Sequence, residues 1–224
     1  MQNLTKTQKI TKIWLSCWLY VITAIAGIII GIMAVNWSDW TLQTKLVAMG
    51  TALLAFHVLE EWHFPGGFHY MYNIMEHSAL PDRYPMNQLS DMWTNWIGIL
   101  FGCFCLIVGV TPLFAVMQFL LCLGEIFAHT KSGFYVKRLY KDKGKRTIYN
   151  PGLFTSMFGY LPIAIGLVVS FFIEDTPSIL EVILAIAFGG VLMAISLPGA
   201  EKLCKSKDTP YGYTWGDGYF EKFH

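Results

Sequence analysis

The sequence predicts an all-α fold: a polytopic membrane helix bundle of about six transmembrane helices, with the N- and C-termini inside (N-in, C-in). The 224-residue chain is 54% hydrophobic and 14% charged, whereas soluble domains carry about a quarter charged residues. Its apolar residues form six segments near the ~20 residues that a helix needs to cross the ~30 Å hydrocarbon layer. Its basic residues lie almost entirely on one side of these segments. We therefore expect one membrane-embedded domain over residues 1–224.

The predicted spans are residues 13–35, 43–62, 92–110, 112–130, 152–173 and 178–198. The apolar run of the first span follows Lys6, Lys9 and Lys12, as in a signal peptide. It is longer than the apolar region of a signal peptide and has no small-residue cleavage site. We therefore interpret it as an uncleaved membrane span.

Helix-start residues mark several of these boundaries. Thr111-Pro112, Asn150-Pro151 and Thr176-Pro177 each place an N-cap residue before a proline at the first helical position. Ser90 is a candidate cap for the third span. Pro162 lies within the fifth span and is expected to kink it.

Two pairs of glycines have the spacing of a helix contact in a membrane. Gly27 and Gly31 lie in the first span, and Gly98 and Gly102 lie in the third. Small residues four apart let two helix backbones approach closely. We expect both pairs to serve packing.

The orientation follows from the distribution of Lys and Arg. With the N-terminus inside, fifteen of the sixteen basic residues fall in the N-terminal tail, the 63–91 loop, the 131–150 loop and the C-terminal tail. Only Lys45 lies outside, where Asp39, Glu174 and Asp175 occupy the connections. Since cytoplasmic loops carry an excess of Lys and Arg, we expect an integral, multi-pass protein of the bacterial cytoplasmic membrane.

Seven basic residues gather in the predicted loop 131–150. They can serve as a topology signal that also contacts anionic lipid headgroups. They can instead hold a phosphate-bearing or acidic substrate at the membrane surface. No base-reading motif accompanies them, so membrane lipid is the expected partner and nucleic acid is not.

The second span ends with ionisable residues, which are costly to bury in a membrane and usually mark function. His57, Glu60 and Glu61 follow one another within this otherwise apolar segment. At about 100° per residue, both glutamates lie within roughly 60° of the histidine and one turn away. One helix face therefore offers an imidazole and two carboxylates.

The fourth span offers a second pair of this kind. Glu125 and His129 are four residues apart and share a helix face. Because the second and fourth spans run in the same direction, both pairs are expected at one depth, near the cytoplasmic interface. Asn95, at the start of the third span, and Asn150, at the start of the fifth, belong to the same layer.

These residue types predict a metal site. Two imidazoles with one or two carboxylates suit Zn²⁺, and also Fe²⁺ or Mn²⁺, and such spacings on facing helices are how bundle metal sites are built. We expect a divalent transition metal, with zinc favoured, held by His57, Glu60, Glu125 and His129. A carboxylate free of the metal, Glu60 or Glu61, would be a general base for water.

Each of these residues also has a simpler interpretation. Glu61 can pair with a Lys or Arg at the interface, and His129 can lie at headgroup level. Asn150 is also a plain N-cap before a proline, and Asn95 can bond a neighbouring backbone group. The loop histidines are expected to be interfacial, with His63 a candidate additional ligand or second-layer residue.

The run His57-Val58-Leu59-Glu60-Glu61 resembles the defining motif of the HXXEE-domain family of small integral membrane proteins. His129 in the fourth span and Tyr149-Asn150-Pro151-Gly152 at the start of the fifth are also similar. The resemblance covers roughly residues 50–195. It implies a membrane enzyme with a site at His57, Glu60, Glu61 and His129, and it raises Asn150 from a cap to a catalytic candidate. It implies no particular substrate.

The expected function is that of a membrane-embedded, metal-dependent hydrolase. Its His/Glu site would act at the cytoplasmic side on a lipid-like or lipid-anchored substrate. The alternative is an ion- or proton-coupled transporter that uses the same cluster, although few polar residues continue into the outer halves of the spans. A third interpretation is a non-catalytic scaffold, which would tolerate loss of the glutamates.

Overall fold

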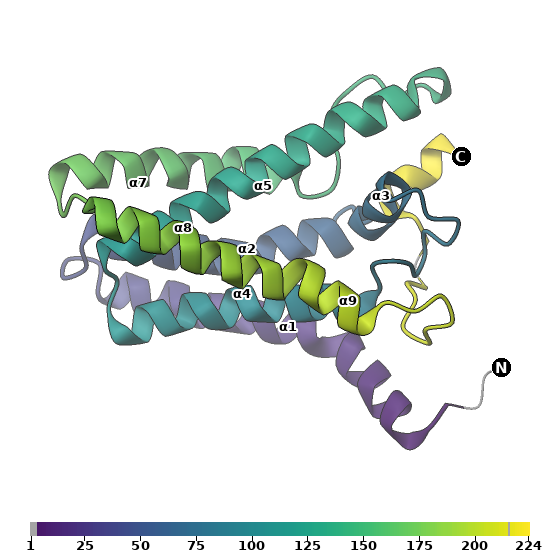
Figure 1. Cartoon of the computed structure of the whole chain (residues 1–224), viewed down its shortest axis with the longest axis horizontal. Helices are drawn as coiled ribbons and strands as arrows, with labels where there is room; N and C mark the ends of the chain where they lie inside the picture. Colours follow the sequence, from purple (N-terminus) through teal and green to yellow (C-terminus); the bar gives the residue numbers. More distant parts are fainter. Residues whose placement is uncertain (1–3, 215) are drawn as a thin grey trace.

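The computed structural model of the protein describes residues 4–214 and 216–224. These residues are 75% helical and form no strand. Six helical segments are long and apolar enough to cross a membrane and run along one long axis (Figure 1). They are α1 Lys6–Val35, α2 Leu42–Trp62, α4 Gln88–Val108, α5 Pro112–Leu139, α6–α7 Leu153–Ile173 and α8–α9 Ile179–Cys204. The predicted all-α fold with six apolar helices is therefore confirmed, and it is compatible with a multi-pass membrane protein.

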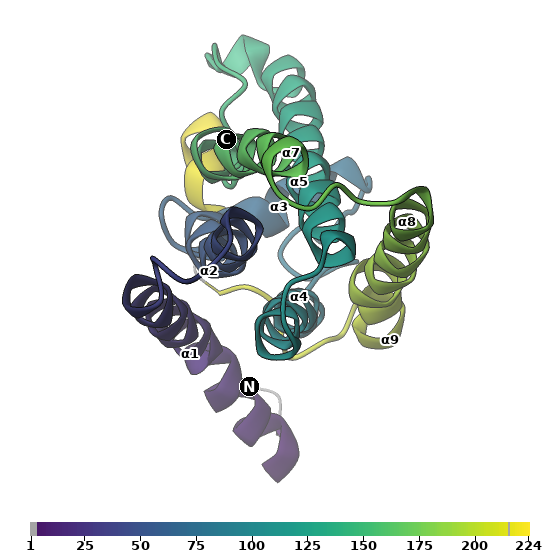
Figure 2. The same cartoon turned by 90° about the vertical axis from the view of Figure 1, so that its left-hand side faces the viewer.

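Helix α2 is the centre of the bundle. It packs against α1, α4, α5 and α7, which surround it in the end-on view of Figure 2. Of its most apolar window, 61% is buried, compared with 11% for the α8–α9 segment at the edge. A side chain on α2 is therefore enclosed by protein on most sides, and a polar group there must find its partners within the bundle.

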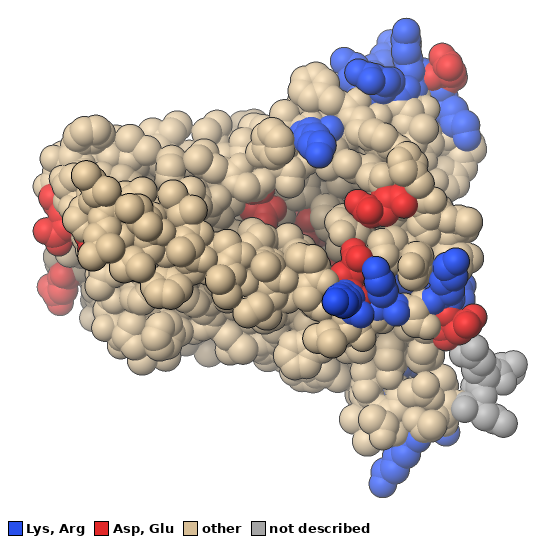
Figure 3. All heavy atoms as spheres, viewed as in Figure 1, with Lys and Arg blue, Asp and Glu red and all other residues tan. Residues whose placement is uncertain are grey.

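Charge divides the two ends of the molecule. Lys and Arg gather, with some Asp and Glu among them, at the end that carries both termini, whereas the charged side chains seen at the opposite end in Figure 3 are acidic. We call the first the basic end. The flank between them is almost wholly uncharged, as expected of a surface that meets hydrocarbon.

Two helices are longer than their predicted spans, because an apolar run marks the part of a helix suited to lipid and not the whole helix. α1 begins at Lys6, where Thr5 and Gln8 form a capping box, and not at residue 13. α5 continues to Leu139 instead of ending at residue 130. Basic residues in its last turn, Lys137 and Arg138, favour the negative end of the helix dipole.

Three predicted caps are corrected by the structure. α4 begins at Gln88, and Asn87 is its N-cap, with Ser90 as the capping-box partner. α8 begins at Ile179 behind the capping box of Ser178 and Glu181, so Thr176 is not its cap. Asn150 is not a cap either, since α6 begins at Leu153 after Gly152. In each case a side chain that satisfies the first free amides decides the start.

The predicted irregularity at Pro162 takes the form of a wide turn. Leu153–Thr155 (α6) continues into a π-helical turn at Ser156–Tyr160, and α7 follows from Leu161 to Ile173. Proline has no amide hydrogen and its ring collides with the carbonyl four residues earlier, so the preceding turn opens. Pro198 lies within a second π turn, Ile195–Gly199, between α8 and α9.

The C-terminal segment folds against the basic end. Tyr213, Phe220 and Phe223 are buried, the last two against the short helix α3, Phe68–Met75, and the end of α5. The Tyr213 ring stacks on His69 at 3.8 Å between centroids. Burial lowers the pKa of His69 to about 3, so this imidazole is neutral at physiological pH.

Lys145 ties the same segment to the connection before α6. Its Nζ donates to the Tyr149 carbonyl at 2.6 Å and to the Tyr219 hydroxyl at 3.2 Å, and it lies 4.6 Å from the Tyr219 ring centre. Burial, and to a lesser extent the nearby Lys222, lowers the pKa of Lys145 to about 8. The basic end is thus a packed layer and not a set of loose loops.

The two glycine pairs differ in how closely a neighbouring helix approaches them. A Cβ atom on Gly98 would lie 2.8 Å from Leu54 Cδ2, and one on Gly102 would collide with the side chain of Thr51. A Cβ atom on Gly27 or Gly31 would meet nothing within 4 Å. The predicted close contact therefore holds for α4 against α2, but not for α1.

We predict that Gly102→Val lowers the melting temperature of the purified protein, whereas Gly31→Val leaves it nearly unchanged. The first substitution forces α4 away from α2, and overpacking of this kind costs about 1–3 kcal/mol. The second adds a side chain to open space on a similar apolar helix. Thermal unfolding in detergent measures both, and equal shifts would contradict the α2–α4 packing described here.

Candidate metal centre

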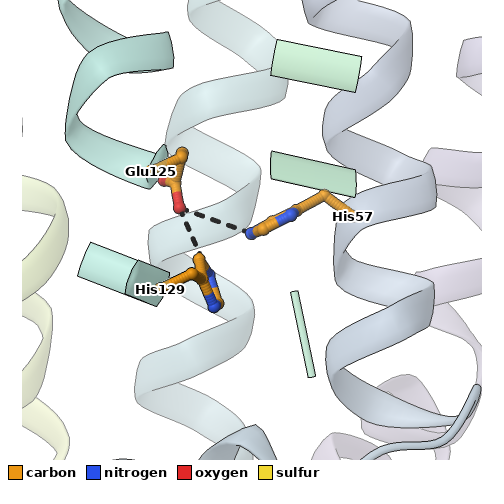
Figure 4. A group of neighbouring side chains, drawn as sticks. All are labelled: His57, Glu125 and His129. Atoms are coloured by element: carbon orange, nitrogen blue, oxygen red, sulfur yellow. Dashed lines mark ion pairs between the residues drawn. The ribbon is translucent and has the colours of Figure 1, made fainter. Parts of the chain in front are cut away.

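Four ionisable side chains from α2 and α5 meet inside the bundle toward its basic end. His57 and Glu61 come from α2, and Glu125 and His129 come from α5. Each pair is four residues apart, so both members project from one face of their helix. Figure 4 shows His57 directed across the helix interface at Glu125 and His129.

The donor atoms alternate around a common centre. His57 Nε2 lies 3.3 Å from Glu125 Oε2 and 3.5 Å from Glu61 Oε1. His129 Nε2 lies 3.3 Å from Glu61 Oε1 and 3.6 Å from Glu125 Oε2. Each imidazole nitrogen therefore faces both carboxylates, and the two rings are nearly perpendicular, at 84°.

The group is closed on one side and open on the other. The side chains of His57, Glu61 and His129 are at most 6% exposed, whereas that of Glu125 is 24% exposed. Glu125 also lines a cavity of about 350 Å³ between α2, α4, α5 and α8. In Figure 3, acidic atoms are visible in a recess of the otherwise apolar flank. Glu125 is thus the member of the group that a reactant in this cavity would meet first.

The far nitrogen of His57 is held by Thr155. His57 Nδ1 lies 2.7 Å from Thr155 Oγ1, and this hydroxyl donates to Glu60 Oε2 at 2.6 Å. Because a hydroxyl has a single hydrogen, its oxygen accepts from the imidazole, which places the His57 proton on Nδ1. In the neutral ring, Nε2 then carries the lone pair that a metal ion requires, whereas in the protonated ring Nε2 carries a hydrogen and faces the carboxylates as a donor.

Asn150 fixes the tautomer of His129 in the same way. Its Nδ2 donates to the His129 carbonyl at 2.8 Å and to the Ile148 carbonyl at 3.1 Å. This fixes the amide so that Oδ1 accepts, and His129 Nδ1 lies 3.0 Å from it. The two histidines therefore have the same tautomer, with both Nε2 lone pairs directed at one point.

Gly152 lets the turn between α5 and α6 pass close to the His129 ring. Its φ is +93°, and a Cβ atom there would collide with the His129 ring. Only glycine combines such a φ with so little bulk. The Tyr149-Asn150-Pro151-Gly152 segment is therefore shaped to hold His129.

Glu60 takes a different place from the one expected of a ligand or base. Its carboxylate accepts from the amides of Phe154 and Thr155 at 3.1 and 2.8 Å, from the Thr155 hydroxyl, and from the Tyr149 hydroxyl at 3.2 Å. A carboxylate at the first turn of a helix satisfies free amides and is favoured by the helix dipole. Glu60 thus supports His57 through Thr155, while Glu61 meets both imidazoles.

Two further candidates lie outside the four-residue group. Asn95 donates to the Asp91 carboxylate and carbonyl, each at 3.0 Å, although it lines the same cavity as Glu125. His63 is the C-cap of α2, and its exposed ring lies 6.2 Å from that of Phe64 between centroids. Neither ring nor amide belongs to the converging donor set.

Sequence reasoning missed two residues that matter here. Thr155 connects Glu60 to His57, and Asp91 accepts from Trp62 Nε1 at 2.6 Å and from the Tyr213 hydroxyl at 2.9 Å. Asp91 could have been found from the sequence, since it is a carboxylate one turn before Asn95 at the start of an apolar helix. Thr155 carried none, because a threonine in an apolar span commonly bonds its own backbone.

The donor set is suited to a metal ion. His57, Glu125 and His129 each offer a ligand atom, and these atoms lie within 4.8 Å of one another. Imidazole nitrogens with their second nitrogen held by a hydrogen bond are typical of metal ligands. This buried group could therefore hold a metal, as the sequence predicted for three of its four ligands.

The comparisons with known proteins bear on the same residues. The family described as "Protein of unknown function with HXXEE motif" matches residues 48–167, which is more than half of the chain. The matched range includes His57, Glu60 and Glu61, the motif itself, together with Glu125 and His129. Neither the curated proteins nor the solved structures yield a significant match. The chain belongs to the HXXEE family.

Proposed function

We propose that the protein is a metal-dependent membrane enzyme, a hydrolase that acts on a lipid-like or lipid-anchored substrate. The observation that carries this proposal is the convergence of two imidazole Nε2 atoms on the carboxylates of Glu61 and Glu125. The group lies beside a cavity between apolar helices. Buried ionisable residues at such a place are expensive and mark function.

His57, His129 and Glu125 would hold the ion. Two histidines and one glutamate are a known ligand set of catalytic zinc, which keeps a further position open, and the same set accepts Fe²⁺ or Mn²⁺. When bound, a divalent ion supplies Lewis-acid polarisation of a carbonyl or phosphoryl oxygen. Zinc is favoured because two of the three ligands are imidazoles.

Glu61 would be the general base. Its Oε1 lies beside both imidazole nitrogens, where it can accept a proton from the attacking water. The water oxygen bonds to the carbonyl carbon, the ester C–O bond breaks, and the proton passes from Glu61 to the leaving oxygen. Asn150 and Glu60 are positioning residues, which act through His129 and through Thr155 and His57.

We predict about one zinc ion per chain after purification in zinc and dialysis, measured by elemental analysis. His57→Ala and His129→Ala should lose the ion, because each removes a ligand. Glu60→Gln and Asn150→Ala should keep it with about 10–100-fold weaker affinity, as is typical of residues that orient ligands. His63→Ala, at the C-cap of α2, is the matched control and should bind normally. Wild-type protein without the ion would overturn the proposed metal site.

The reaction can be separated from transport with Glu61→Gln. We predict that zinc-loaded wild-type protein releases product from a panel of acyl- and headgroup-labelled lipids in vesicles. Glu61→Gln should keep the metal and lose about 10²-fold or more in rate, since general-base catalysis contributes about that much. If no lipid is cleaved and the protein instead carries protons or cations across proteoliposomes in a Glu61-dependent manner, the transporter alternative replaces the hydrolase.

The proposed orientation places the basic end, with both termini and the metal group, in the cytoplasm. The gathering of Lys and Arg at that end supports it. We predict that a fluorescent protein fused after His224 is fluorescent in bacteria, whereas alkaline phosphatase fused there is inactive. The same fusions after Asp39, in the α1–α2 connection, should give the reverse pattern. Active phosphatase at the C-terminus would refute this topology.

A further inference from the structure

The cavity beside Glu125 is elongated along the helices. Its wall on α4 extends from Thr94 to Cys105, and its wall on α5 from Phe114 to Glu125. At 1.5 Å per residue, each wall is about 16 Å long. The cavity is therefore elongated parallel to the helix axes, with Glu125 and the candidate metal site at one end.

The cavity opens sideways, toward the apolar flank. Three of its lining residues on the last span, Ile186, Met193 and Leu197, are 57%, 38% and 38% exposed. α4 packs against the Ile195–Gly199 turn and α9, while α8 packs against α5. Gly189 and Gly190 line the cavity from α8 without a side chain. The exposed lining residues thus place the opening beside α8, toward α4, on a flank where hydrocarbon would face it in a membrane; Figure 2 shows the positions of these two helices in the bundle.

The lining changes from polar to apolar along this length. The lining toward the basic end is polar and consists of Thr94, Asn95, Glu125 and Ser196. The lining at the other end is apolar and consists of Val47, Cys105, Phe114 and Met117. The polar side chains between them have partners within the protein, since the Thr51 hydroxyl donates to the Val47 carbonyl and Gln118 Nε2 to Cys122 Sγ. Among the residues that the structure describes, the middle of the cavity therefore carries no charged side chain, and most of its lining residues are apolar or glycine.

We infer that the cavity receives one acyl chain of a membrane lipid from the leaflet at the basic end. The lipid enters between α4 and α8, its chain runs toward Phe114 and Val47, and its ester group lies beside Glu125. A lipid of that leaflet already has this orientation, with the polar group at the basic end and the chain toward mid-membrane. The inference names the substrate class of the proposed hydrolase and rests on that proposal for the role of the ester.

Photolabelling in lipid nanodiscs tests this. The probe is a phosphatidylcholine in a phosphatidylcholine bilayer, with a diazirine either near the ester or at the end of one acyl chain. The chain-end probe should label Val47, Cys105 and Met117, which are only 2%, 2% and 7% exposed and out of reach of lipid around the bundle. The ester-proximal probe should label Asn95 and Glu125. Labels in the reverse order would overturn the orientation.

Blocking the opening provides the control. A Cβ atom on Gly190 meets nothing within 4 Å, so Gly190→Leu should fold and project into the cavity. Labelling of the buried wall should fall about tenfold, as expected if the new side chain costs the bound chain about 1.4 kcal/mol. Labelling of Ile107 and Val35, each 83% exposed, should not change. Gly27→Leu is the matched control, because that glycine also faces open space but lies on α1.

This design distinguishes a failure of the acyl-chain site from a failure of the proposed metal site. Labelling of the buried wall should persist in His57→Ala and in chelator-treated protein, because neither change touches the apolar end. If labelling persists but no zinc binds, the chain site stands and the proposed hydrolase does not. If zinc binds but the buried wall is unlabelled, or Gly190→Leu labels like wild type, the acyl-chain site is refuted.

Discussion

The contact between His57 and Glu61 on α2 and Glu125 and His129 on α5 is the constraint on which the rest of the structure depends. Four ionisable groups inside an apolar bundle are stable only if each finds a partner there. Each imidazole Nε2 lies within 3.6 Å of two carboxylate oxygens, a contact that is favourable when the ring is protonated or a cation lies between the donor atoms. This requirement holds α2 and α5 in one relative position, because a shift of either helix would leave buried polar groups unpaired.

The connection between α5 and α7 follows from the same requirement. An imidazole has two nitrogens, and those turned away from the centre need partners as well. Asn150 and Thr155 supply them, and Glu60 in turn holds Thr155 and the first amides of α6. Gly152 lets the turn approach the ring of His129. One segment of the chain thus both starts the fifth long apolar helix and sets the tautomers of the two histidines.

The position of the group within the bundle also bears on its chemistry. It lies between α2 and α5, and through Glu125 it meets a cavity whose far end is apolar. A path for ions across the whole molecule would need polar groups beyond that point, and the cavity ends at Val47 and Phe114. The arrangement is one-sided, which suits a reaction on a molecule that is itself polar at one end and apolar at the other.

The sequence by itself determined the six apolar helices and the His57, Glu125 and His129 donors, because hydrophobic length and helical phase depend only on neighbouring residues. It misplaced two helix ends by several residues, since a helix can extend beyond its apolar run: α1 begins at the capping box of Thr5 and Gln8, and α5 continues to Leu139. Only the tertiary structure separated Glu60 from Glu61: both lie near His57 in helical phase, and the helix that each one faces decides its role. Thr155 and the cavity were likewise invisible in the sequence, because they depend on which helices pack against α2.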